Sequence, residues 1–278
     1  MPSRNTPGPI GSEYTSKQLH DNSIYPPEDD VTISVLLGSF ISLDILACAS
    51  TRGTPFLEID HTQVLGNLDI SLETLMGCSS SVMALILEVS QLDMWKKEAQ
   101  AAHRLSIADL ARRGGQIEQR LQQELTDTKN TPSTAGRRAQ SSNPARLFSA
   151  SPHRDVSQLF ALAAVTYLHV VVSGAHPELP EIAQTVSKTI HVFNRLDEPR
   201  LLQSAVWPFC VSGCLARPDQ QSFFRGLLSA AKGTKSCTGT LLEAYSIIEE
   251  CWEARKTSSY NCDWASVMSQ CGRYVLLR

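Results

Sequence analysis

Apolar residues recur at three- and four-residue spacing through most of this 278-residue chain, and the signals of β-hairpins are nearly absent. Apolar side chains at that spacing share one face of an α-helix. No Asn-Gly or Asp-Gly dipeptide occurs, and no long alternation of apolar and polar residues lies outside the last few residues. The sequence therefore predicts an all-α fold, in which antiparallel helix pairs form a helical bundle or a short solenoid.

Changes of composition along the chain separate a flexible leader from a helical domain. Residues 1–30 are rich in Pro, Ser, Asn and Gly and predict the leader, whereas residues 31–278 predict the domain. Inside the domain, residues 127–154 are polar and basic, with no acidic residue from Lys129 to Arg154. Such a segment buries too little apolar surface to offset the entropy lost on ordering, so it predicts a disordered basic linker.

Two long helices are predicted before that linker. Residues 71–95 carry a broad apolar face, and residues 98–125 carry a narrower stripe. A kink or break is expected at Gly114-Gly115, because each Gly inside a helix costs about 1 kcal/mol relative to Ala. The stripe lasts under three heptads, so core packing is the main interpretation, and a coiled coil or partner helix is the alternative.

Local signals also predict where helices begin in the second half. Asp155 with Gln158, and Thr240 with Glu243, have the spacing of a capping box, in which two side chains satisfy the first free amides of a helix. Pro180 is expected in the first turn of another helix, where its missing N–H costs nothing.

Two apolar stretches, Val31–Ser50 and Val156–His176, raise the question of a membrane span. The first contains Asp44 and several serines, and the second contains polar residues such as His169. A spanning helix needs roughly 20 predominantly apolar residues with anchoring flanks. Neither stretch is that clean, so we predict that both are buried core helices and that the chain makes no membrane contact.

Charge and cysteine usage restrict the class of protein further. The formal net charge is −3, which does not supply the positive field that binding to phosphates requires. The chain has eight cysteines but neither a secretory signal at its start nor an Asn-x-Ser/Thr acceptor. We therefore expect reduced thiols in an intracellular compartment and no DNA-binding residue.

The motifs of catalysis and metal binding are missing from the sequence. There is no Cys-x-x-Cys, no Gly-x-Ser-x-Gly and no phosphate-binding glycine loop. Cys210 and Cys214 lie on one face of an apolar helix, where a thiol usually serves as a small hydrophobe. We expect no catalytic, metal or cofactor-binding residue, no cofactor in this chain, and no enzyme activity. A small helical enzyme remains an alternative, which a cleft lined by titratable groups would favour.

Several short segments in a fixed order carry a family resemblance. They are Arg52-Gly53-Thr54-Pro55, Gly77-Cys78-Ser79, Tyr167-Leu168-His169, Trp207-Pro208-Phe209 with Gly213-Cys214, and the segments around Trp252 and Trp264. Together they resemble the fungal-specific transcription factor domain, the regulatory region of fungal binuclear zinc-cluster regulators. The resemblance covers roughly residues 31–278, which makes them the expected regulatory domain.

The resemblance implies a nuclear transcription regulator, shuttling with the cytoplasm, that controls metabolic or secondary-metabolite genes. Its expected partners are other proteins, either the transcription machinery or related regulators, in a homodimer or heterodimer. The zinc cluster, with six cysteines in two halves that each begin Cys-x-x-Cys, is missing from this sequence, so DNA contact is expected only indirectly. The alternative is a helical interaction scaffold without a transcriptional role.

Five residues are the candidates for core anchors or for the lining of a pocket between helices. They are Trp207, Phe209, Cys210, Trp252 and Trp264. Large aromatic side chains each bury about 150–250 Å² and dominate helix packing, which favours the role of core anchor.

Overall fold

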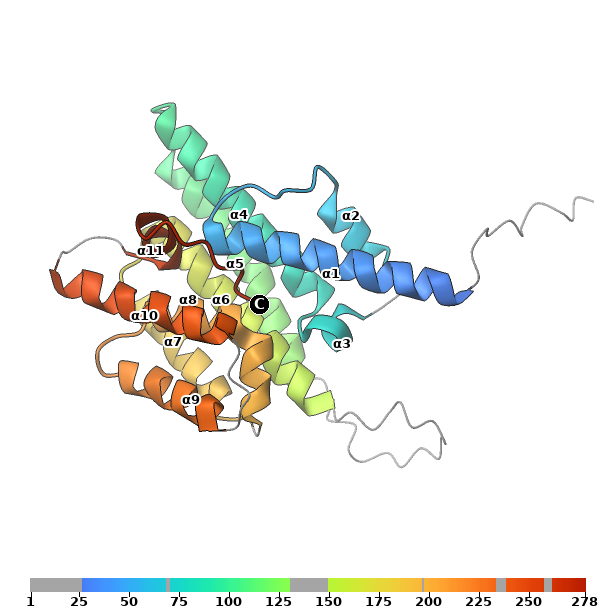
Figure 1. Ribbon diagram of the computed structural model, residues 1–278. Helices are drawn as coiled ribbons and strands as arrows, with labels where there is room; N and C mark the ends of the chain where they lie inside the picture. Colours follow the sequence, from blue (N-terminus) through green and yellow to red (C-terminus); the bar gives the residue numbers. More distant parts are fainter. Residues whose placement is uncertain (1–26, 69–70, 131–149, 197, 234–238, 258–261) are drawn as a thin grey trace, which may run out of the picture.

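The computed structural model describes residues 27–68, 71–130, 150–196, 198–233, 239–257 and 262–278. Within these ranges the chain is helical, without strands, which confirms the predicted all-α class (Figure 1). The elements are α1 (Pro27–Thr51), α2 (His61–Gly66), α3 (Leu72–Met76), α4 (Ser80–Ala101), α5 (Ile107–Asn130), α6 (Ala150–Ser173), α7 (Pro180–Phe193), the 3₁₀ helix η3 (Pro199–Ala205), α8 (Val206–Cys214), α9 (Gln221–Gly233), α10 (Gly239–Thr257) and α11 (Trp264–Gln270).

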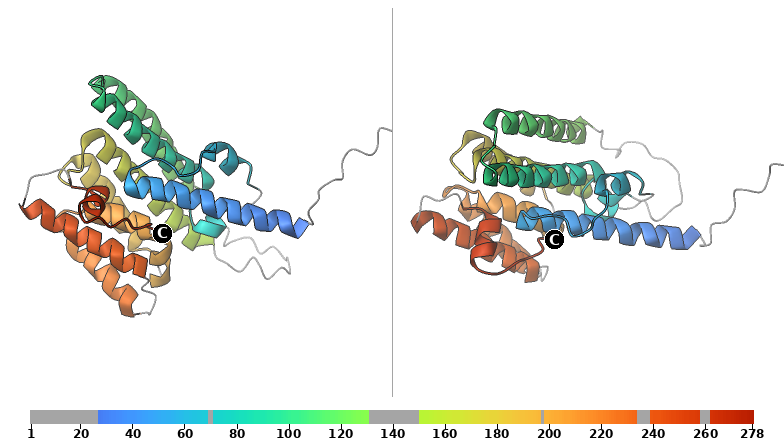
Figure 2. Two further views of the ribbon diagram at one scale, coloured as in Figure 1. Left: turned by 45° about the horizontal axis from the view of Figure 1, so that its top comes forward. Right: turned by 90° about the horizontal axis from the view of Figure 1, so that it is seen from above.

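Helix α6 lies at the centre of the molecule. It packs against α4, α5, α7 and α8, and 89% of its apolar stretch is buried. Figure 2 shows α4 and α6 as a middle layer, with α5 on one side and α1 and α8 on the other. Because neighbours surround α6, a helix that is apolar on every side fits there, and the prediction of a buried core helix is confirmed for this stretch.

The same prediction is wrong for the first half of α1. Leu36, Leu37 and Phe40 are 53%, 38% and 61% exposed, whereas Ile41 and Ile45 are fully buried. The cause is position, because the N-terminal half of α1 extends past the other helices and only its second half is covered (Figure 1). By length and composition, both α1 and α6 could cross a membrane, but a mostly buried core helix passes the same test.

Three predicted boundaries shift by short distances. The expected helix at 71–95 is divided at Gly77, which has φ of 75°, and Ser79 caps α4 by accepting from the Val82 amide. The predicted leader loses its last residues to α1, which begins at Pro27; Pro is favoured in a first turn. The predicted linker is shorter at both ends, and residues 131–149 lie outside the described ranges, as do residues 1–26 of the leader.

The predicted break at Gly114-Gly115 is wrong, because α5 continues as one helix through both residues. A Cβ atom on Gly114 would lie 2.9 Å from Val172 Cγ2, so this Gly permits α5 and α6 to approach closely. The chain turns earlier, between α4 and α5, where His103 adopts a positive φ of 54°. Ser106, directly before α5, then caps that helix with its hydroxyl, which accepts from the Asp109 amide.

The signals for helix starts in the second half are partly correct. Pro180 is the first residue of α7, as predicted. Asp155 does not cap a helix, because α6 already begins at Ala150; its carboxylate instead accepts from Arg195 Nη2 at 2.7 Å. Thr240 lies inside the first turn of α10 rather than at its cap. Both expected capping boxes therefore lie inside helices that begin earlier than predicted.

Candidate protein-interaction surface

The five candidate anchors all lie in the hydrophobic core. Trp207, Phe209, Cys210 and Trp264 are fully buried, and Trp252 is 3% exposed. Helices α8, α10 and α11 thus direct these side chains inward, and the exposed surface of the protein must perform its functions with other residues.

Hydrogen bonds and ring contacts fix two of these tryptophans. Trp252 Nε1 donates to the Gly213 carbonyl at 2.9 Å, joining α10 to α8. Trp264 Nε1 donates to the Ala49 carbonyl at 3.2 Å, joining α11 to α1, and its ring packs edge-on to Tyr167 at 5.4 Å. These contacts tie the end of the chain to its first helix.

Burial keeps several of the buried thiols protonated. Burial, together with hydrogen bonds among the thiols, raises the pKa of Cys214 and of Cys251 well above the ordinary value. Burial likewise raises the pKa of Cys78. A nucleophile or metal ligand must be a thiolate, so these cysteines act as small apolar groups. Among the described residues, no three His, Cys, Asp or Glu side chains converge on a metal position.

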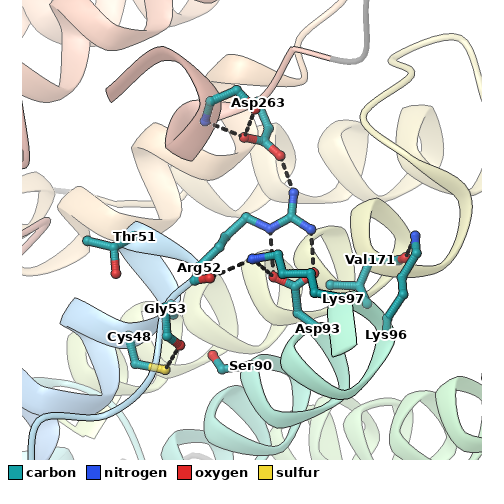
Figure 3. Close-up of polar contacts among 12 residues, drawn as sticks. Cys48, Thr51, Arg52, Gly53, Ser90, Asp93, Lys96, Lys97, Val171 and Asp263 are labelled. Atoms are coloured by element: carbon teal, nitrogen blue, oxygen red, sulfur yellow. Dashed lines mark hydrogen bonds and ion pairs between the residues drawn. The ribbon is translucent and has the colours of Figure 1, made fainter. Parts of the chain in front are cut away.

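A buried ion cluster joins α1, α4 and α11 (Figure 3). Arg52 directly follows the last residue of α1 and has a positive φ of 53°, and its guanidinium pairs with Asp93 on α4 and Asp263 at the start of α11. Nε of Arg52 donates to Asp93 Oδ2 at 2.9 Å. Lys97 Nζ lies 3.0 Å from the same oxygen and 2.6 Å from the Arg52 carbonyl oxygen.

The electrostatics of this cluster indicate a structural clamp. Burial alone would raise the pKa of Asp93, but the Arg52 guanidinium and Lys97 outweigh burial and hold that pKa below its usual value. Burial raises the pKa of the Cys48 thiol to about 11 and also raises the pKa of Tyr167. The acid therefore stays ionised and paired while the thiol and phenol stay protonated, which leaves no general base or nucleophile in the cluster.

The exposed apolar surface is concentrated in one short part of the chain. Eight large apolar residues between positions 31 and 59 are 38% to 83% exposed. We call them the α1 patch: Val31, Ile33, Leu36, Leu37, Phe40, Phe56, Leu57 and Ile59. Exposed apolar patches of more than a few hundred Å² are typical of interaction sites.

Asp44 fixes the loop after α1 against that helix. Its carboxylate accepts from the amides of Phe56 at 2.8 Å and Leu57 at 3.0 Å, and His61 Nε2 lies 2.8 Å away. Burial raises the pKa of Asp44, but these hydrogen bonds outweigh it and lower the pKa below the usual value. Asp44 lies one turn beyond Phe40, so the loop continues the apolar surface of the helix.

A second surface feature is a half-open groove of about 540 Å³ between α5, α6 and α7. Its lining includes the apolar residues Leu125, Leu162 and Val192 and the basic residues Lys188, His191 and Arg195. Arg195 Nη2 donates to Gln158 Oε1 at 2.6 Å and to Asp155 Oδ1 at 2.7 Å, which fixes the guanidinium beside Gln158 in the lining of the groove.

Sequence reasoning missed both surfaces. The available signal for the α1 patch was the absence of a polar face on α1, where Asp44 is the sole charged residue from Val31 to Thr51. A helix without a polar face is either surrounded by neighbours or presents apolar groups to a partner. The sequence alone did not distinguish these two cases.

Comparison with known proteins places this architecture in a family. The model of the fungal-specific transcription factor domain matches residues 11–277. A trichothecene biosynthesis transcription regulator of Trichoderma arundinaceum is 34% identical over 84% of this chain and 51% of its own length. Its counterpart in Fusarium sporotrichioides is 31% identical over 87% of this chain and 54% of its own length.

A more distant relative, the ustiloxin B cluster transcription factor of Aspergillus flavus, is 30% identical over 84% of this chain and 40% of its own length. The chain thus spans about half the length of these relatives. No solved structure matched. The relatives carry the names of transcription regulators and not of enzymes, as predicted. The chain belongs to the fungal-specific transcription factor domain family.

Proposed function

We propose that this chain regulates transcription of the genes of a fungal biosynthetic cluster and does so in the nucleus. The observation that carries the proposal is the family match across residues 11–277. Relatives named as regulators of trichothecene biosynthesis and of the ustiloxin B cluster supply the class of target genes.

The mechanism we propose is contact with other proteins, with DNA reached only indirectly and without a cofactor. The sequence has no zinc-cluster spacing of cysteines and no net positive charge to bind phosphates. The described surface instead offers the uncharged α1 patch, which is suited to a protein partner.

A tethering experiment tests this function. The whole chain is fused to a heterologous DNA-binding module and a fluorescent tag, and a reporter gene carries that module's sites. We expect nuclear fluorescence and a reporter output changed at least severalfold relative to the module alone. The variant Phe40→Glu should lose the effect, and Ile107→Glu, an exposed apolar residue outside the patch, should keep it. A reporter at background level with the fusion in the nucleus would contradict the proposal.

A second candidate function is the binding of a small organic anion as an effector, favoured by the groove between α5, α6 and α7. Its volume falls within the ~300–1,000 Å³ of typical ligand sites, and it combines apolar walls with three basic residues. Decanoate is a suitable probe, with 1-decanol as the uncharged control, in titration calorimetry. We expect saturable binding of decanoate that Lys188→Gln with His191→Gln weakens and Lys232→Gln does not. Equal binding of the acid and the alcohol would contradict this function.

A further inference from the structure

The α1 patch is large enough for a specific protein interface. Eight side chains that are 38% to 83% exposed leave on the order of 700 Å² of apolar surface in water, more than the largest patch on a typical monomer. A standard interface buries about 800 Å² on each partner. The patch can therefore supply most of one side of such an interface.

The arrangement of the patch on α1 suits a partner that is itself a helix. Ile33, Leu37 and Phe40 are spaced three, four and seven residues apart, so they form one stripe along α1 (Figure 1). Along this stripe the backbone forms its hydrogen bonds within α1, so it offers no free N–H or C=O groups to an extended chain. A partner must therefore satisfy its own backbone groups, as an α-helix does. About three turns of such a helix cover the distance from Ile33 to Asp44.

The charges of the segments that frame the patch have one sign. In the sequence from Pro27 to Met76, which includes α1, α2 and α3, Arg52 is the single Lys or Arg. Its guanidinium is already bound to Asp93 and Asp263. The acidic residues of the same stretch are Glu28, Asp29, Asp30, Asp44, Glu58, Asp60, Asp69 and Glu73. These segments therefore carry a clear excess of negative charge.

Two of these carboxylates lie within the patch itself. Glu58 and Asp60 are exposed and alternate with apolar residues of the patch, in the loop that Asp44 holds against α1. Glu73 is half-buried on α3, which packs against α1, whereas Arg278 contacts the C-terminal end of α3. Acidic groups are thus placed beside the apolar surface, where basic groups of a partner can pair with them.

We infer that the α1 patch binds a cationic amphipathic helix of another protein, with apolar residues against the stripe and Lys or Arg side chains against the carboxylates. This inference rests on the proposed function and deepens it by giving the chemistry of the protein partner. Opposite charges across an interface favour the correct partner and speed association. A second copy of the chain would bring acidic groups together, and anionic lipid head groups would meet the same repulsion.

Fluorescence anisotropy of the full chain with two labelled peptides tests the inference. The probe is the Leu–Lys helix LKKLLKLLKKLLKL, and the same peptide with Glu in place of every Lys is the control. At about 50 mM salt we expect saturable binding of the Lys peptide with a Kd of about 1–10 µM, and binding of the Glu peptide at least about tenfold weaker. Salt at about 500 mM should weaken binding of the Lys peptide severalfold by screening. Equal binding of the two peptides would overturn the inference.

A double variant locates the binding site of the Lys peptide. Leu36→Ser with Phe40→Ser removes apolar surface without changing the charge, and it should weaken binding at least about tenfold. Ile107→Ser, at an exposed apolar position outside the patch, should bind as the wild type does. Helical circular dichroism and an unchanged Tm verify that the double variant is folded. Undiminished binding by the double variant would place the peptide elsewhere and overturn the inference.

The contribution of charge is measured with a second pair of substitutions. Glu58→Gln with Asp60→Asn removes two carboxylates, and Asn preserves the hydrogen bond by which Asp60 caps α2. We expect binding of the Lys peptide to weaken severalfold at low salt. Glu98→Gln with Glu178→Gln removes two exposed carboxylates outside the patch and should leave binding unchanged. Equal effects of the two pairs would show attraction to net charge alone and would overturn the inference.

Sedimentation velocity and vesicle flotation test the two other occupants of the patch. A wild-type dimer that Leu36→Ser with Phe40→Ser dissociates would make a second copy the occupant. Because α1 meets the length and composition of a membrane span, flotation with phosphatidylcholine–phosphatidylserine vesicles is measured as well. Flotation of the wild type but not of the double variant would make lipid the occupant. We expect neither result, and either one would overturn the inference. The tethered reporter is read separately, so helix binding and transcriptional function can fail independently.

Discussion

Arg52 donates from Nη1 to Asp263 Oδ2 across 211 positions of sequence, so the end of the first helix is bound directly to the start of the last one. The Asp93 and Asp263 side chains are only 1% and 3% exposed. One guanidinium compensates both buried carboxylates, and Asp263 also caps α11 by accepting from the Ser266 amide at 2.8 Å. The α1 patch is thereby presented by a helix whose other end is fixed to the domain.

Replacing this guanidinium should strongly destabilise the fold. Arg52→Met leaves the buried Asp263 carboxylate without this cation and leaves Asp93 with Lys97 alone, and breaking a buried pair typically costs about 3–5 kcal/mol. Urea unfolding followed by circular dichroism measures the loss. Arg104→Met, at an exposed position, should change the free energy of unfolding by less than about 0.5 kcal/mol. An Arg52→Met protein as stable as the wild type would contradict the clamp.

Asp44 should make stability depend on pH in the acid range. Its folded-state pKa lies below the ordinary value of 3.8, so its contribution is complete above about pH 5 and is lost as pH falls through the lowered pKa. Asp44→Asn should therefore cost roughly 1–3 kcal/mol at pH 6, and this cost should shrink as the pH falls through the lowered pKa of Asp44. Urea titrations across that range test this. If the difference in free energy of unfolding between variant and wild type stayed constant with pH, the proposed role of Asp44 would be refuted.

The two adjacent glycines of α5 should respond oppositely to a larger side chain. A Cβ at Gly115 meets nothing within 4 Å, whereas one at Gly114 would lie 2.9 Å from Val172 Cγ2. Gly115→Leu should stabilise the protein by up to about 1 kcal/mol through helix propensity. Gly114→Leu should destabilise it by about 1–3 kcal/mol, because α5 and α6 must separate. Equal effects in thermal unfolding would show that the close approach is not required.

Gly213 on α8 should be intolerant of even one methyl group. A Cβ there would lie 2.5 Å from Ile248 Cδ1 on α10. Gly213→Ala should lower the free energy of unfolding by roughly 1–3 kcal/mol. Adding Ile248→Val removes that Cδ1 atom and should restore part of the loss, which a double-mutant cycle measures. Additive effects of the two substitutions would contradict direct contact.

Local sequence rules predicted the helices and several of their ends. The start of α7 at Pro180, for example, follows from a residue that acts on its own turn. Local sequence rules cannot predict contacts that depend on the tertiary arrangement. Asp155 has the sequence pattern of a helix cap, yet α6 already begins at Ala150. The carboxylate of Asp155 instead accepts a hydrogen bond from Arg195, 40 positions away.

The candidate surface was less predictable than the fold for the same reason. Periodicity identifies α1 as helical but does not show which apolar residues have neighbours, so the predicted core helix Val31–Ser50 includes Leu36 and Phe40, which are exposed. Exposure depends on where α2 and the loop at Phe56 pack, and Asp44 sets that position through hydrogen bonds 12 and 13 residues away. The five aromatic and thiol candidates, by contrast, lie on the covered faces of their helices.

The most direct test of the account is transcript sequencing in the fungus that carries this gene, before and after the gene is deleted. The deleted strain is complemented with the wild type, with Leu36→Glu and Phe40→Glu together, or with Ile107→Glu at matched protein levels. The account predicts that transcripts of one biosynthetic gene cluster change on deletion, and that the wild type and Ile107→Glu restore them while the double variant does not. The account would be contradicted if the deletion left the transcript levels of every biosynthetic cluster unchanged, or if the double variant restored them fully.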